Sequence, residues 1–440
     1  MGVKVVVIGA GMAGIMAAQT LHDAGLDVVL LEARNRIGGR THTDHSLGAP
    51  IDLGAAWVHG IDGNPLTPIA QQLGVDWGHT DFLNRSGTVV QAYDEDGRPL
   101  DQAEYAAGLQ LGLGAFALAA GSQLYDLPQS VQTFRDLLDA GMPKPDNLSP
   151  AAEQGFYYQT VIHTEYVSAA DAEQISARLS GSYVSLTGGD YLLHGGGFNA
   201  LTDHLVAGLD VRLETAVSHI TLSDNNIILQ TSVGELTADY AVLAVPLGVL
   251  KQGSIDFDPP LPAEKTAVIE RIGFGSYEKI ALRFDKFYWP RAQQRFNYLS
   301  TGDPSLFHAW LNVGYYTGEP IIISYHAHRR ARRINEMSDA ELVAQVVEKM
   351  TLMFGDEFGP VPEPVAYART NWEGDPFSRG SYSFDSVGQL PNDRNVLAAG
   401  VNGRIFFAGE ATHPHFYATV HGAYETGIRA AREIIGISSK

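Results

Sequence analysis

The chain has 440 residues, of which 45% are hydrophobic and 18% are charged, as is ordinary for a globular protein with a large core. Its length exceeds what one core usually fills, so two domains are expected. A formal net charge of −20 makes nucleic acid a poor partner and favours a cationic ligand. The chain has no cysteine, which excludes disulfides and thiolate metal sites, and no metal ion is expected.

Three elements at the start of the chain predict a βαβ unit. The apolar, β-branched run at 3–8 is typical of a buried parallel strand. A helix is expected at 11–22 and a second apolar strand at 27–31. No apolar run reaches the roughly 18 residues that span a bilayer. Because the first strand also begins at Val3, we expect no presequence, no membrane segment and a cytoplasmic location.

Glycines in GxGxxG spacing, Gly9, Gly11 and Gly14, join the first strand to the helix. Gly9 allows a tight turn, Gly11 lets backbone N–H groups approach a pyrophosphate, and Gly14 lets the helix pack closely on the strand. Glu32 ends the second strand, where such a unit places a carboxylate for ribose hydroxyls, and this disfavours NADP. The fingerprint alone leaves FAD and NAD open.

The segment after Glu32 separates these two cofactors. Arginines flank a pair of glycines there, and arginines in such a place can clamp a pyrophosphate from its far side. The run EARNRIGGR resembles the second FAD motif of the flavin-containing amine oxidases. The resemblance implies FAD as the cofactor, bound in part by Ala33, Arg34, Gly39 and Arg40, with Arg36 and Gly38 beside them.

The next motif, DLGAAWVHG at 52–60, supplies small residues. Gly54, Ala55 and Ala56 would let a flat ring system lie against the backbone. In the family that the chain resembles, a similar segment runs beside the flavin. This implies Trp57 as a neighbour of the cofactor and His59 as a residue of the substrate pocket. Without the resemblance, Trp57 is typical of a core and His59 of a loop.

Residues 78–195 lose the βαβ rhythm. Helices are expected at 100–121, 130–140 and 154–166, and Pro150 with its neighbouring prolines marks a break. The apolar stretch at 109–120 is too short for a membrane and is interpreted as a core helix. We interpret this region as the first half of an inserted substrate domain.

The chain then returns to the nucleotide domain. We expect a helix at 198–207, a strand at 210–213, a hairpin of 219–222 and 227–230 with Asn225 and Asn226 in its turn, and one strand at 236–245. The sequence YAVLAVPLGVL with FDPPLP strongly resembles the same family. The resemblance implies that the backbone near Val217 contacts the adenine.

Residues 275–370 are interpreted as the second half of the substrate domain. Strands are expected at 277–284, 306–313 and 321–325. Ser338 with Glu341 predicts a capping box. The helix that follows is expected to end at Gly355, and its apolar stripe is expected in the core.

Lys279 stands in the middle of the strand GSYEKIALRF, among apolar neighbours. A lysine there costs desolvation unless it has a partner, and an edge-strand lysine that points to solvent is the other interpretation. The position matches the strand lysine of the amine oxidases, which holds a water against flavin N5. The resemblance implies that Lys279 positions this water and assists reoxidation of the flavin, and a depressed pKa suits that role.

The segment WEGDPFSRGSY at 372–382 resembles a W-x-x-(D/E)-P-x-x-x-G-x-Y segment of the amine oxidases. This implies that Trp372 lies near the flavin edge and that Tyr382 forms one wall of an aromatic cage, which guides an amine to the ring. Where monoamine oxidases have a cysteine that binds FAD covalently, this chain has Ser381. Thioether attachment is therefore excluded.

The C-terminal region predicts a strand at 404–410 that turns at Gly409, and a helix at 419–435 with Thr419 as its N-cap. The match to the FAGE and HGA segments of the family implies that Gly409 and Glu410 lie near the ribityl and pyrophosphate groups. It also implies that the helix start faces the flavin pyrimidine ring, where a positive helix end stabilises negative charge. The helix residues concerned are Thr419, Val420 and Ala423.

Thr419 replaces the second cage tyrosine of the monoamine oxidases. The run ATVHGA at 418–423 instead resembles other polyamine oxidases and the histone lysine demethylases, and 440 residues leave no room for the helical tower of the demethylases. Phe416 and Tyr417 are candidates for pocket aromatics, with core packing as the alternative.

Together these observations predict an α/β plus α+β fold. A Rossmann-like FAD-binding domain comprises 1–77, 196–274 and 371–440. An inserted substrate-binding domain of mixed sheet and helices comprises 78–195 and 275–370.

The resemblance implies an FAD-dependent amine oxidase of the polyamine oxidase-like branch. An uncharged amine would transfer hydride from its α-carbon to flavin N5, the imine would be hydrolysed, and O2 would reoxidise the flavin to give hydrogen peroxide. The partners are a small cationic amine and O2, while the exact amine and the subunit count stay open. Candidates for binding distal ammonium groups are Glu165 and Asp190.

Two alternatives remain. The first is an oxidase of another monoamine or of an amino acid, with Arg295, Arg329 and Arg379 as candidates for binding a carboxylate. The second is a flavin-binding protein without turnover, against which the intact Lys279, Trp372 and Tyr382 argue.

Overall fold

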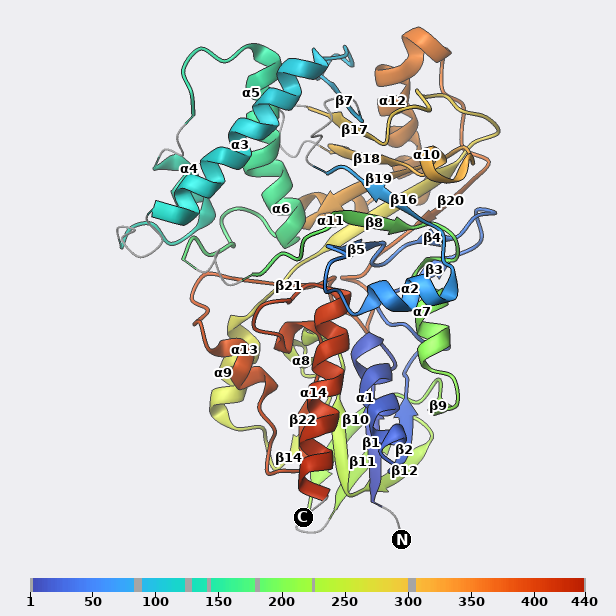
Figure 1. Ribbon diagram of the computed structural model, residues 1–440, viewed down its shortest axis with the longest axis vertical. Helices are drawn as coiled ribbons and strands as arrows, with labels where there is room; N and C mark the ends of the chain where they lie inside the picture. The colour runs from blue at the N-terminus through green and yellow to red at the C-terminus, as the bar shows by residue number, and fades with distance from the viewer. Residues whose placement is uncertain are drawn as a thin grey trace.

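The computed structural model describes residues 3–82, 89–122, 129–140, 144–178, 183–223, 226–299 and 306–438, without the side chains of 116–122. Figure 1 shows an elongated molecule with both termini at its lower end. A parallel sheet fills the lower half, and a larger mixed sheet with flanking helices fills the upper half. The fold is α/β plus α+β, as the sequence predicts.

The lower half is built on a five-stranded parallel sheet in the order β22-β13-β1-β2-β9. Its strands are β1 (Lys4–Ile8), β2 (Asp27–Leu31), β9 (Asp210–Arg212), β13 (Tyr240–Leu243) and β22 (Ile405–Phe407). Side chains of a strand point alternately to its two faces. Val5 and Val7 accordingly pack under helices, while Val6 and Ile8 pack against a second sheet.

Helices α1 (Met12–Asp23), α7 (Gly197–Leu205) and α14 (Val420–Ser438) cover one face of this sheet. Helices α1 and α14 lie side by side in Figure 1. A Cβ at Gly427 of α14 would lie 2.1 Å from the Ala13 carbonyl oxygen of α1, so glycine permits this close packing.

The other face packs against a four-stranded sheet in the order β12-β11-β10-β14. Its strands are β10 (Val217–Leu222), β11 (Ile227–Thr231), β12 (Gly234–Ala238) and β14 (Asp256–Asp258). The predicted hairpin is β10 and β11, with Leu222 opposite Ile227. Asn225 of its turn lies outside the described residues.

The upper half contains a six-stranded sheet in the order β20-β16-β19-β18-β17-β7. Its strands are β7 (Val90–Tyr93), β16 (Tyr277–Arg283), β17 (Arg295–Tyr298), β18 (Ala309–Asn312), β19 (Ile321–Ala327) and β20 (Ala366–Arg369). Helix α12 (Asp339–Phe358) packs its apolar stripe on this sheet, so the stripe is core, as predicted. The capping box of Ser338 and Glu341 is also present.

Helices on the left of Figure 1 close this half. They are α3 (Gln102–Ser122), α4 (Phe134–Asp139), α5 (Pro150–Tyr157), a π turn (Tyr158–Ile162) and α6 (His163–Ser168). None of the described helices is long and apolar enough to cross a membrane.

Short elements join the two halves. A three-stranded sheet comprises β5 (Trp57–His59), β8 (Asp190–Leu193) and β6 (Trp77–Thr80), and two-stranded pairs are β3 (Thr43–Asp44) with β4 (Ile51–Asp52), and β15 (Gly273–Phe274) with β21 (Ser383–Phe384). The remaining helices are α2 (Leu66–Leu73), α8 (Leu247–Lys251), α9 (Ala263–Arg271), α10 (Gly314–Thr317), α11 (His328–Asn335), α13 (Asp393–Ala398) and a 3-10 turn (Glu410–Thr412).

Several predicted boundaries are wrong. Pro150 opens α5 at its first turn instead of marking a break, because a proline there loses no helical hydrogen bond. The strand predicted at 236–245 is two strands, since the Asp239 carboxylate accepts the Lys4 amide and ends the first one. Helix α12 continues past Gly355 to Phe358. The helix predicted at 130–140 is only α4, which starts after the Thr133 capping box.

Strand predictions also differ at their ends. The strand predicted at 306–313 is limited to β18, and the one at 404–410 to β22, because Glu410 begins the 3-10 turn. Strand β14, which pairs in parallel with β10, was not predicted.

Candidate active site

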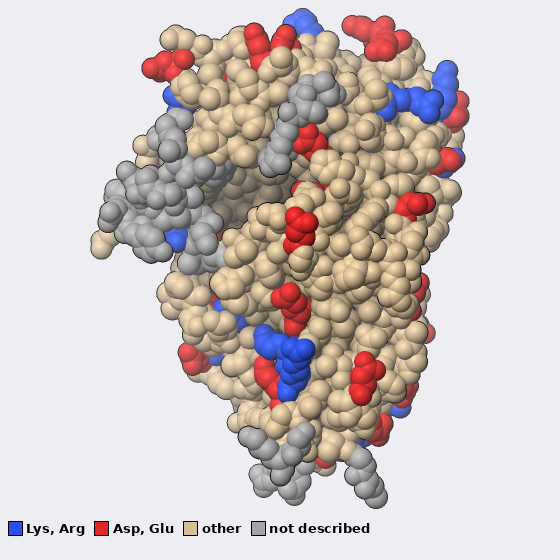
Figure 2. Space-filling model, viewed as in Figure 1, with Lys and Arg blue, Asp and Glu red and all other residues tan. Residues whose placement is uncertain are grey.

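A cavity of about 1030 Å³ runs through the middle of the molecule. This is the upper end of the roughly 300–1,000 Å³ of small-molecule and cofactor sites. Figure 2 shows the surface hollowed in its upper part. The cavity collects residues that follow the carboxyl ends of the parallel strands, namely Gly9 after β1, Glu32 after β2, Val245 after β13 and Gly409 after β22. Open parallel sheets usually bind ligands at this edge.

Most of the predicted site residues line this cavity. Those from the nucleotide motifs are Gly9, Gly11, Glu32, Ala33, Arg34, Gly39, Arg40, Gly54, Ala55, Ala56, Trp57, Val217, Gly409, Glu410, Val420 and Ala423. Those predicted nearer the chemistry are His59, Lys279, Trp372, Tyr382 and Thr419. Gly14 does not line it. A Cβ at Gly14 would lie 1.8 Å from the Gly9 carbonyl oxygen, so this glycine serves the packing of α1.

Glycines at the cavity wall fit a nucleotide. Gly9 has φ +100°, and a Cβ there would meet the Ala244 carbonyl oxygen at 3.0 Å, so the turn itself requires glycine. At Gly11 and Gly409 the nearest protein atoms to an added Cβ are 3.9 and 4.0 Å away, although the backbone of Gly409, with φ +123°, also favours glycine. No close protein neighbour crowds a side chain at either position, and both face the cavity. Backbone left bare toward a cavity lets a pyrophosphate approach closely.

Glu32 is held in place to receive hydroxyl groups. One carboxylate oxygen accepts the Ala10 amide at 2.8 Å and the other accepts the Arg34 amide at 2.9 Å. Each oxygen keeps lone-pair capacity toward the cavity. The donor set therefore fits the ribose of a dinucleotide.

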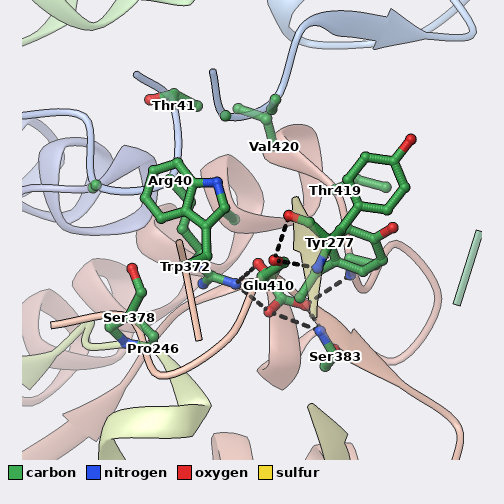
Figure 3. Close-up of a pocket in the computed structure, with 18 of the residues that line it drawn as sticks. Arg40, Thr41, Pro246, Tyr277, Trp372, Ser378, Ser383, Glu410, Thr419 and Val420 are labelled. Carbon is green, nitrogen blue, oxygen red and sulfur yellow. Dashed lines mark hydrogen bonds and ion pairs between the residues drawn. The ribbon is translucent and has the colours of Figure 1, made fainter. Parts of the chain in front are cut away.

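The arginines of EARNRIGGR have different positions. Arg34 donates to Asp375 at 2.9 Å, and Arg40 donates to Glu410 at 2.9 Å. Figure 3 shows Arg40 and Ser383 joined to Glu410. Burial alone would raise the pKa of Glu410, but the Arg40 guanidinium and the Ser383 hydroxyl lower it below its ordinary value. Arg36 instead donates to loop carbonyls and lies outside the cavity lining, where it shapes the loop.

Lys279 is buried, with 3% of its surface exposed, and not a solvent-facing edge lysine. Its Nζ donates to the carbonyl oxygens of Asp52 at 2.7 Å and Gly54 at 2.6 Å. Burial lowers the pKa of Lys279 to about 8, although the nearby Asp52 carboxylate raises it. The lysine thus ties strand β16 to the segment predicted to lie beside the flavin.

Glu278, the neighbour of Lys279 in β16, holds the segment that carries Trp372. Glu278 accepts the Trp372 amide at 2.7 Å and the Thr370 hydroxyl at 2.5 Å. Side chains alternate along a strand, so Lys279 faces the cavity while Glu278 anchors the 370–373 segment. This anchoring holds the Trp372 ring at the cavity wall.

An aromatic cluster surrounds Tyr382. Its hydroxyl donates to the Tyr166 carbonyl at 2.7 Å, and its ring centroid lies 5.9 Å from that of Tyr277. Tyr277 in turn lies 5.8 Å from Tyr325, and the Lys279 ammonium lies 5.5 Å from the Tyr325 ring. Burial raises the pKa of Tyr277, Tyr325 and Tyr382, so all three stay neutral phenols.

Sequence reasoning missed Tyr277 and Tyr325 as pocket aromatics. Both stand in strands, and strand aromatics are as often core as site. The available signal was spacing: Tyr277 precedes Lys279 by two positions and therefore shares its face. Of the two aromatics proposed near Thr419, Tyr417 lines the cavity, whereas Phe416 stacks on His413 and lies outside the lining.

Thr419 is the N-cap of α14, as predicted. Its hydroxyl accepts the Gly422 amide at 3.0 Å and donates to the Phe416 carbonyl at 2.7 Å. The hydroxyl therefore uses its one donor and one of its two acceptor sites at the helix start. Figure 3 shows Thr419 and Val420 in the pocket with Trp372 and Tyr277.

Of the two acidic candidates for ammonium binding, only one lines the cavity. Asp190 lines the cavity and lies 3.0 Å from His59 Nδ1. Burial raises the pKa of Asp190, but the hydrogen bonds from His59 and the Gly60 amide lower it below its ordinary value. Glu165 is wrong as a candidate. It is fully buried outside the cavity lining, and Arg330 donates to it at 2.7 Å.

The three arginine candidates for carboxylate binding also differ in where they lie relative to the cavity. Arg295 lines the cavity with 6% of its surface exposed. Arg329 does not line it and lies 3.7 Å from Glu165 and 3.6 Å from Asp171. Arg379 lines the cavity beside Ser378, which accepts a hydrogen bond from Arg34, so it belongs to the nucleotide end.

Known proteins resemble this chain along nearly its whole length. The family model for flavin-containing amine oxidoreductases matches residues 12–435. Polyamine oxidase 2 of Arabidopsis thaliana is 34% identical over 98% of this chain and 87% of its own length. Polyamine oxidase 4 of Oryza sativa subsp. japonica is 35% identical over 98% and 88%.

More distant similarities agree as well. Lysine-specific histone demethylase 2 of Homo sapiens is 30% identical over 98% of this chain, which spans 53% of that protein. A solved structure of a putrescine oxidase double mutant superposes with a TM-score of 0.75 over 99% of both chains at 21% identity, which shows a shared fold. With the family model across its length and polyamine oxidases among its relatives, the chain belongs to the flavin-containing amine oxidoreductases and is an FAD-dependent enzyme.

Proposed function

We propose that this enzyme oxidises a CH–NH bond of a polyamine or a related elongated amine. The observation that carries the proposal is the continuity of one cavity, from the glycine cradle at Gly11 to the tyrosine cluster beside Lys279. The polyamine oxidases among its relatives support this choice of substrate class.

The amine loses a hydride from its α-carbon and a proton from its nitrogen and becomes an imine, and water hydrolyses the imine to an aldehyde and the departing amine. The two electrons pass to O2, which takes up two protons and leaves as hydrogen peroxide. FAD, when bound, supplies the acceptor for the hydride.

The residues of the nucleotide end bind and orient the cofactor. Glu32 would accept ribose hydroxyls, and the bare backbone at Gly11 and Gly409 would face the pyrophosphate. Buried Glu410 and partly exposed Arg40 form an ion pair next to this path, which fixes the local charge. No cysteine is available for a thioether bond.

The residues of the substrate end position the amine. Neutral tyrosines offer ring faces and hydroxyl groups to an amine, and aromatic faces attract its cationic form on entry. Asp190, with His59, is the proposed partner of a distal ammonium group. Lys279 would hold a water with its remaining N–H group, since two of its three donors bind Asp52 and Gly54.

We also propose the division into an FAD-binding part (1–77, 196–274 and 371–440) and a substrate-binding part (78–195 and 275–370). The parallel sheet draws all its strands from the first part and the six-stranded sheet draws its strands from the second, which supports the division. Strand β8 belongs to the second part by sequence but pairs with β5 of the first, and with β6, of which only Trp77 belongs to the first.

Anaerobic mixing of the FAD-loaded enzyme with single amines tests the function. Spermidine, putrescine, a monoamine and an amino acid are added separately, and the flavin absorbance is followed. We expect the polyamine to bleach the absorbance fastest, and readmitted O2 to restore it with formation of hydrogen peroxide. If no amine bleaches the flavin, the proposal is wrong.

A further inference from the structure

Arg295 is a buried cation in the wall of the cavity. It belongs to β17 and keeps 6% of its surface exposed. Its Nη1 donates to the Phe82 carbonyl oxygen at 3.0 Å, and its Nη2 donates to the Tyr158 hydroxyl at 3.4 Å. Both acceptors are neutral. A guanidinium has five N–H donors, so its capacity is only partly used.

No ion pair involves Arg295 within the part of the chain that the structure describes. His163 lies near Arg295 but cannot pair with it. Burial, together with the positive charge of Arg295, lowers the pKa of His163 to about 4, so the imidazole is neutral. Asp190, which also lines the cavity, is engaged with His59 and the Gly60 amide. Buried charges are normally paired, because an isolated one loses its hydration without compensation.

The position of Arg295 relative to Lys279 sets the reach of a ligand. The Lys279 ammonium lies 5.9 Å from the Trp57 ring, and Trp57 lies 5.1 Å from the Phe82 ring. The Arg295 guanidinium lies 5.0 Å from the other side of this series, over Phe82. The contacts from the lysine to the arginine thus pass through the Trp57 and Phe82 rings, and both charged groups line the same cavity. An extended chain can contact both of them.

We propose that Arg295 binds a carboxylate at the far end of an elongated amine substrate. The inference rests on the proposed function and extends its substrate class to elongated amines in which several carbons separate the reacting nitrogen from an acidic group. A carboxylate accepts two parallel hydrogen bonds from a guanidinium and neutralises its charge. An α-amino acid, whose carboxylate is one carbon from its amine, is too short for both ends.

A polycation alone is a poor match for this end of the cavity. A second ammonium placed beside Arg295 would repel it, in a site where burial weakens screening. The same site gains a charge-assisted contact when the ligand carries a carboxylate. The arginine thus distinguishes two otherwise similar chains by the group at their end.

A matched pair of ligands tests the proposal. One is spermidine, and the other is spermidine with one terminal aminomethyl group replaced by a carboxylate. Binding to the FAD-loaded enzyme is measured by calorimetry, and kcat/KM is measured by peroxide formation. We expect the carboxylated chain to bind about 10-fold more tightly than spermidine or better, as for a hydrogen bond between charged groups.

Variants identify Arg295 as the cause. Arg295→Gln should lower the preference for the carboxylated chain about 10- to 100-fold, and Arg295→Lys should retain part of it because the charge remains. Arg291→Gln is the control, since the Arg291 guanidinium lies over the Phe287 ring, 4.4 Å from its centroid, and outside the cavity lining. It should leave the preference unchanged.

The outcomes are separable from those of the oxidase proposal. Equal binding of the two ligands by the wild-type enzyme, or a preference that Arg295→Gln and Arg295→Lys both leave intact, overturns the role of Arg295. If Arg295→Gln does not fold, the ligand preferences of the wild-type enzyme and of Arg295→Lys test the role of Arg295. If neither ligand bleaches the flavin, the oxidase proposal fails, while calorimetry still decides whether a carboxylate is bound through Arg295.

Discussion

Lys279 and Asp52 form a buried pair whose charges depend on each other. The lysine ammonium reaches the Asp52 backbone carbonyl, while the Asp52 carboxylate accepts the Thr43 hydroxyl at 2.5 Å and the Phe198 amide at 3.1 Å. Burial raises the pKa of Asp52 to about 7 and lowers that of Lys279 to about 8. Desolvation disfavours both charged forms, and their mutual attraction opposes it.

Replacement of Lys279 tests its role toward oxygen. We expect Lys279→Met to slow reoxidation of the reduced enzyme by roughly 100-fold or more, the scale of positioned proton transfer. Stopped-flow mixing of reduced enzyme with oxygenated buffer measures this rate. Lys251→Met is the control, because Lys251 also donates to a backbone carbonyl, that of Glu270, but lies outside the cavity lining. Unchanged oxygen kinetics in Lys279→Met would remove the role.

Replacement of Asp52 tests the pH dependence of stability. Its folded pKa of about 7 lies above its ordinary value of 3.8, so its contribution is full below about pH 4 and is lost as the pH rises through 7. Asn cannot titrate but keeps an acceptor oxygen. The stability of Asp52→Asn relative to wild type should therefore increase between about pH 4 and 7, by up to about 1.4 kcal/mol per pH unit.

Urea unfolding across this pH range measures the difference. A constant difference between Asp52→Asn and wild type would show that the carboxyl does not titrate as stated.

For single residues, the sequence predicted which ones belong to the site better than it predicted which partners surround them. Lys279 and Tyr382 were expected in the site because their motifs match a family, and both line the cavity. Glu165 was misplaced because the sequence does not reveal that Arg330, far along the chain, neutralises it. Arg295 was one of three open candidates, since only the folded chain shows which arginine is buried in the cavity wall and, among the described residues, has no ion pair.

The turn between β1 and α1 combines two kinds of glycine. Gly14 is required by packing, whereas Gly11 meets no protein atom within 3.9 Å. Gly11 also has φ −78°, which any residue adopts. The physical argument for glycine at this position is therefore the ligand and not the fold.

Substitution of these glycines separates the two requirements. Gly11→Ala should fold with a stability within about 1 kcal/mol of wild type, yet bind FAD at least about 10-fold more weakly, because the methyl group occupies the pyrophosphate path. Gly14→Ala should strongly lower the stability of the FAD-free protein, because the added methyl group would clash with the Gly9 carbonyl oxygen. Thermal unfolding of the FAD-free proteins and flavin titration measure both quantities. Full FAD affinity in Gly11→Ala would contradict the assigned path.

Elements with strong local signals were predicted well, including their ends. Ends that depend on tertiary or capping contacts were not. Strands β1 and β2 are predicted within a residue, because apolar runs and glycines bound them. The division of 236–245 into β12 and β13 depends on Asp239, whose partner Lys4 is distant in sequence. The early start of α5 depends on Ser149, whose hydroxyl accepts the Ala152 amide. Such tertiary and capping contacts decide boundaries.

For the molecule as a whole, parallel pairing explains how distant stretches form one site. Strands β1, β13 and β22 come from the start, middle and end of the chain and lie side by side in the parallel sheet. Their carboxyl ends meet at one edge, where the nucleotide motifs collect. The upper sheet then places Lys279 and Arg295 across the same cavity. The sequence motifs predict the first arrangement, whereas the second depends on strand order, which no motif encodes.

The charge of the whole molecule should govern the encounter with substrate. A net charge of −20 attracts a polycation from a distance, and this attraction is screened beyond about 10 Å at 0.1 M salt. For spermidine, kcat/KM should fall several-fold between about 0.01 and 0.5 M salt, while kcat stays constant, because chemistry follows binding. Steady-state kinetics in sodium chloride measure both.

The carboxylated chain provides the internal comparison for this prediction. Its carboxylate cancels part of the long-range attraction, so its kcat/KM should fall less steeply with salt than that of spermidine. Its contact with Arg295 is short and buried, and such contacts are screened far less than surface charges. Parallel salt curves for the two ligands would therefore show that steering by net charge does not distinguish them, and a flat curve for spermidine would show that the acidic surface does not guide it.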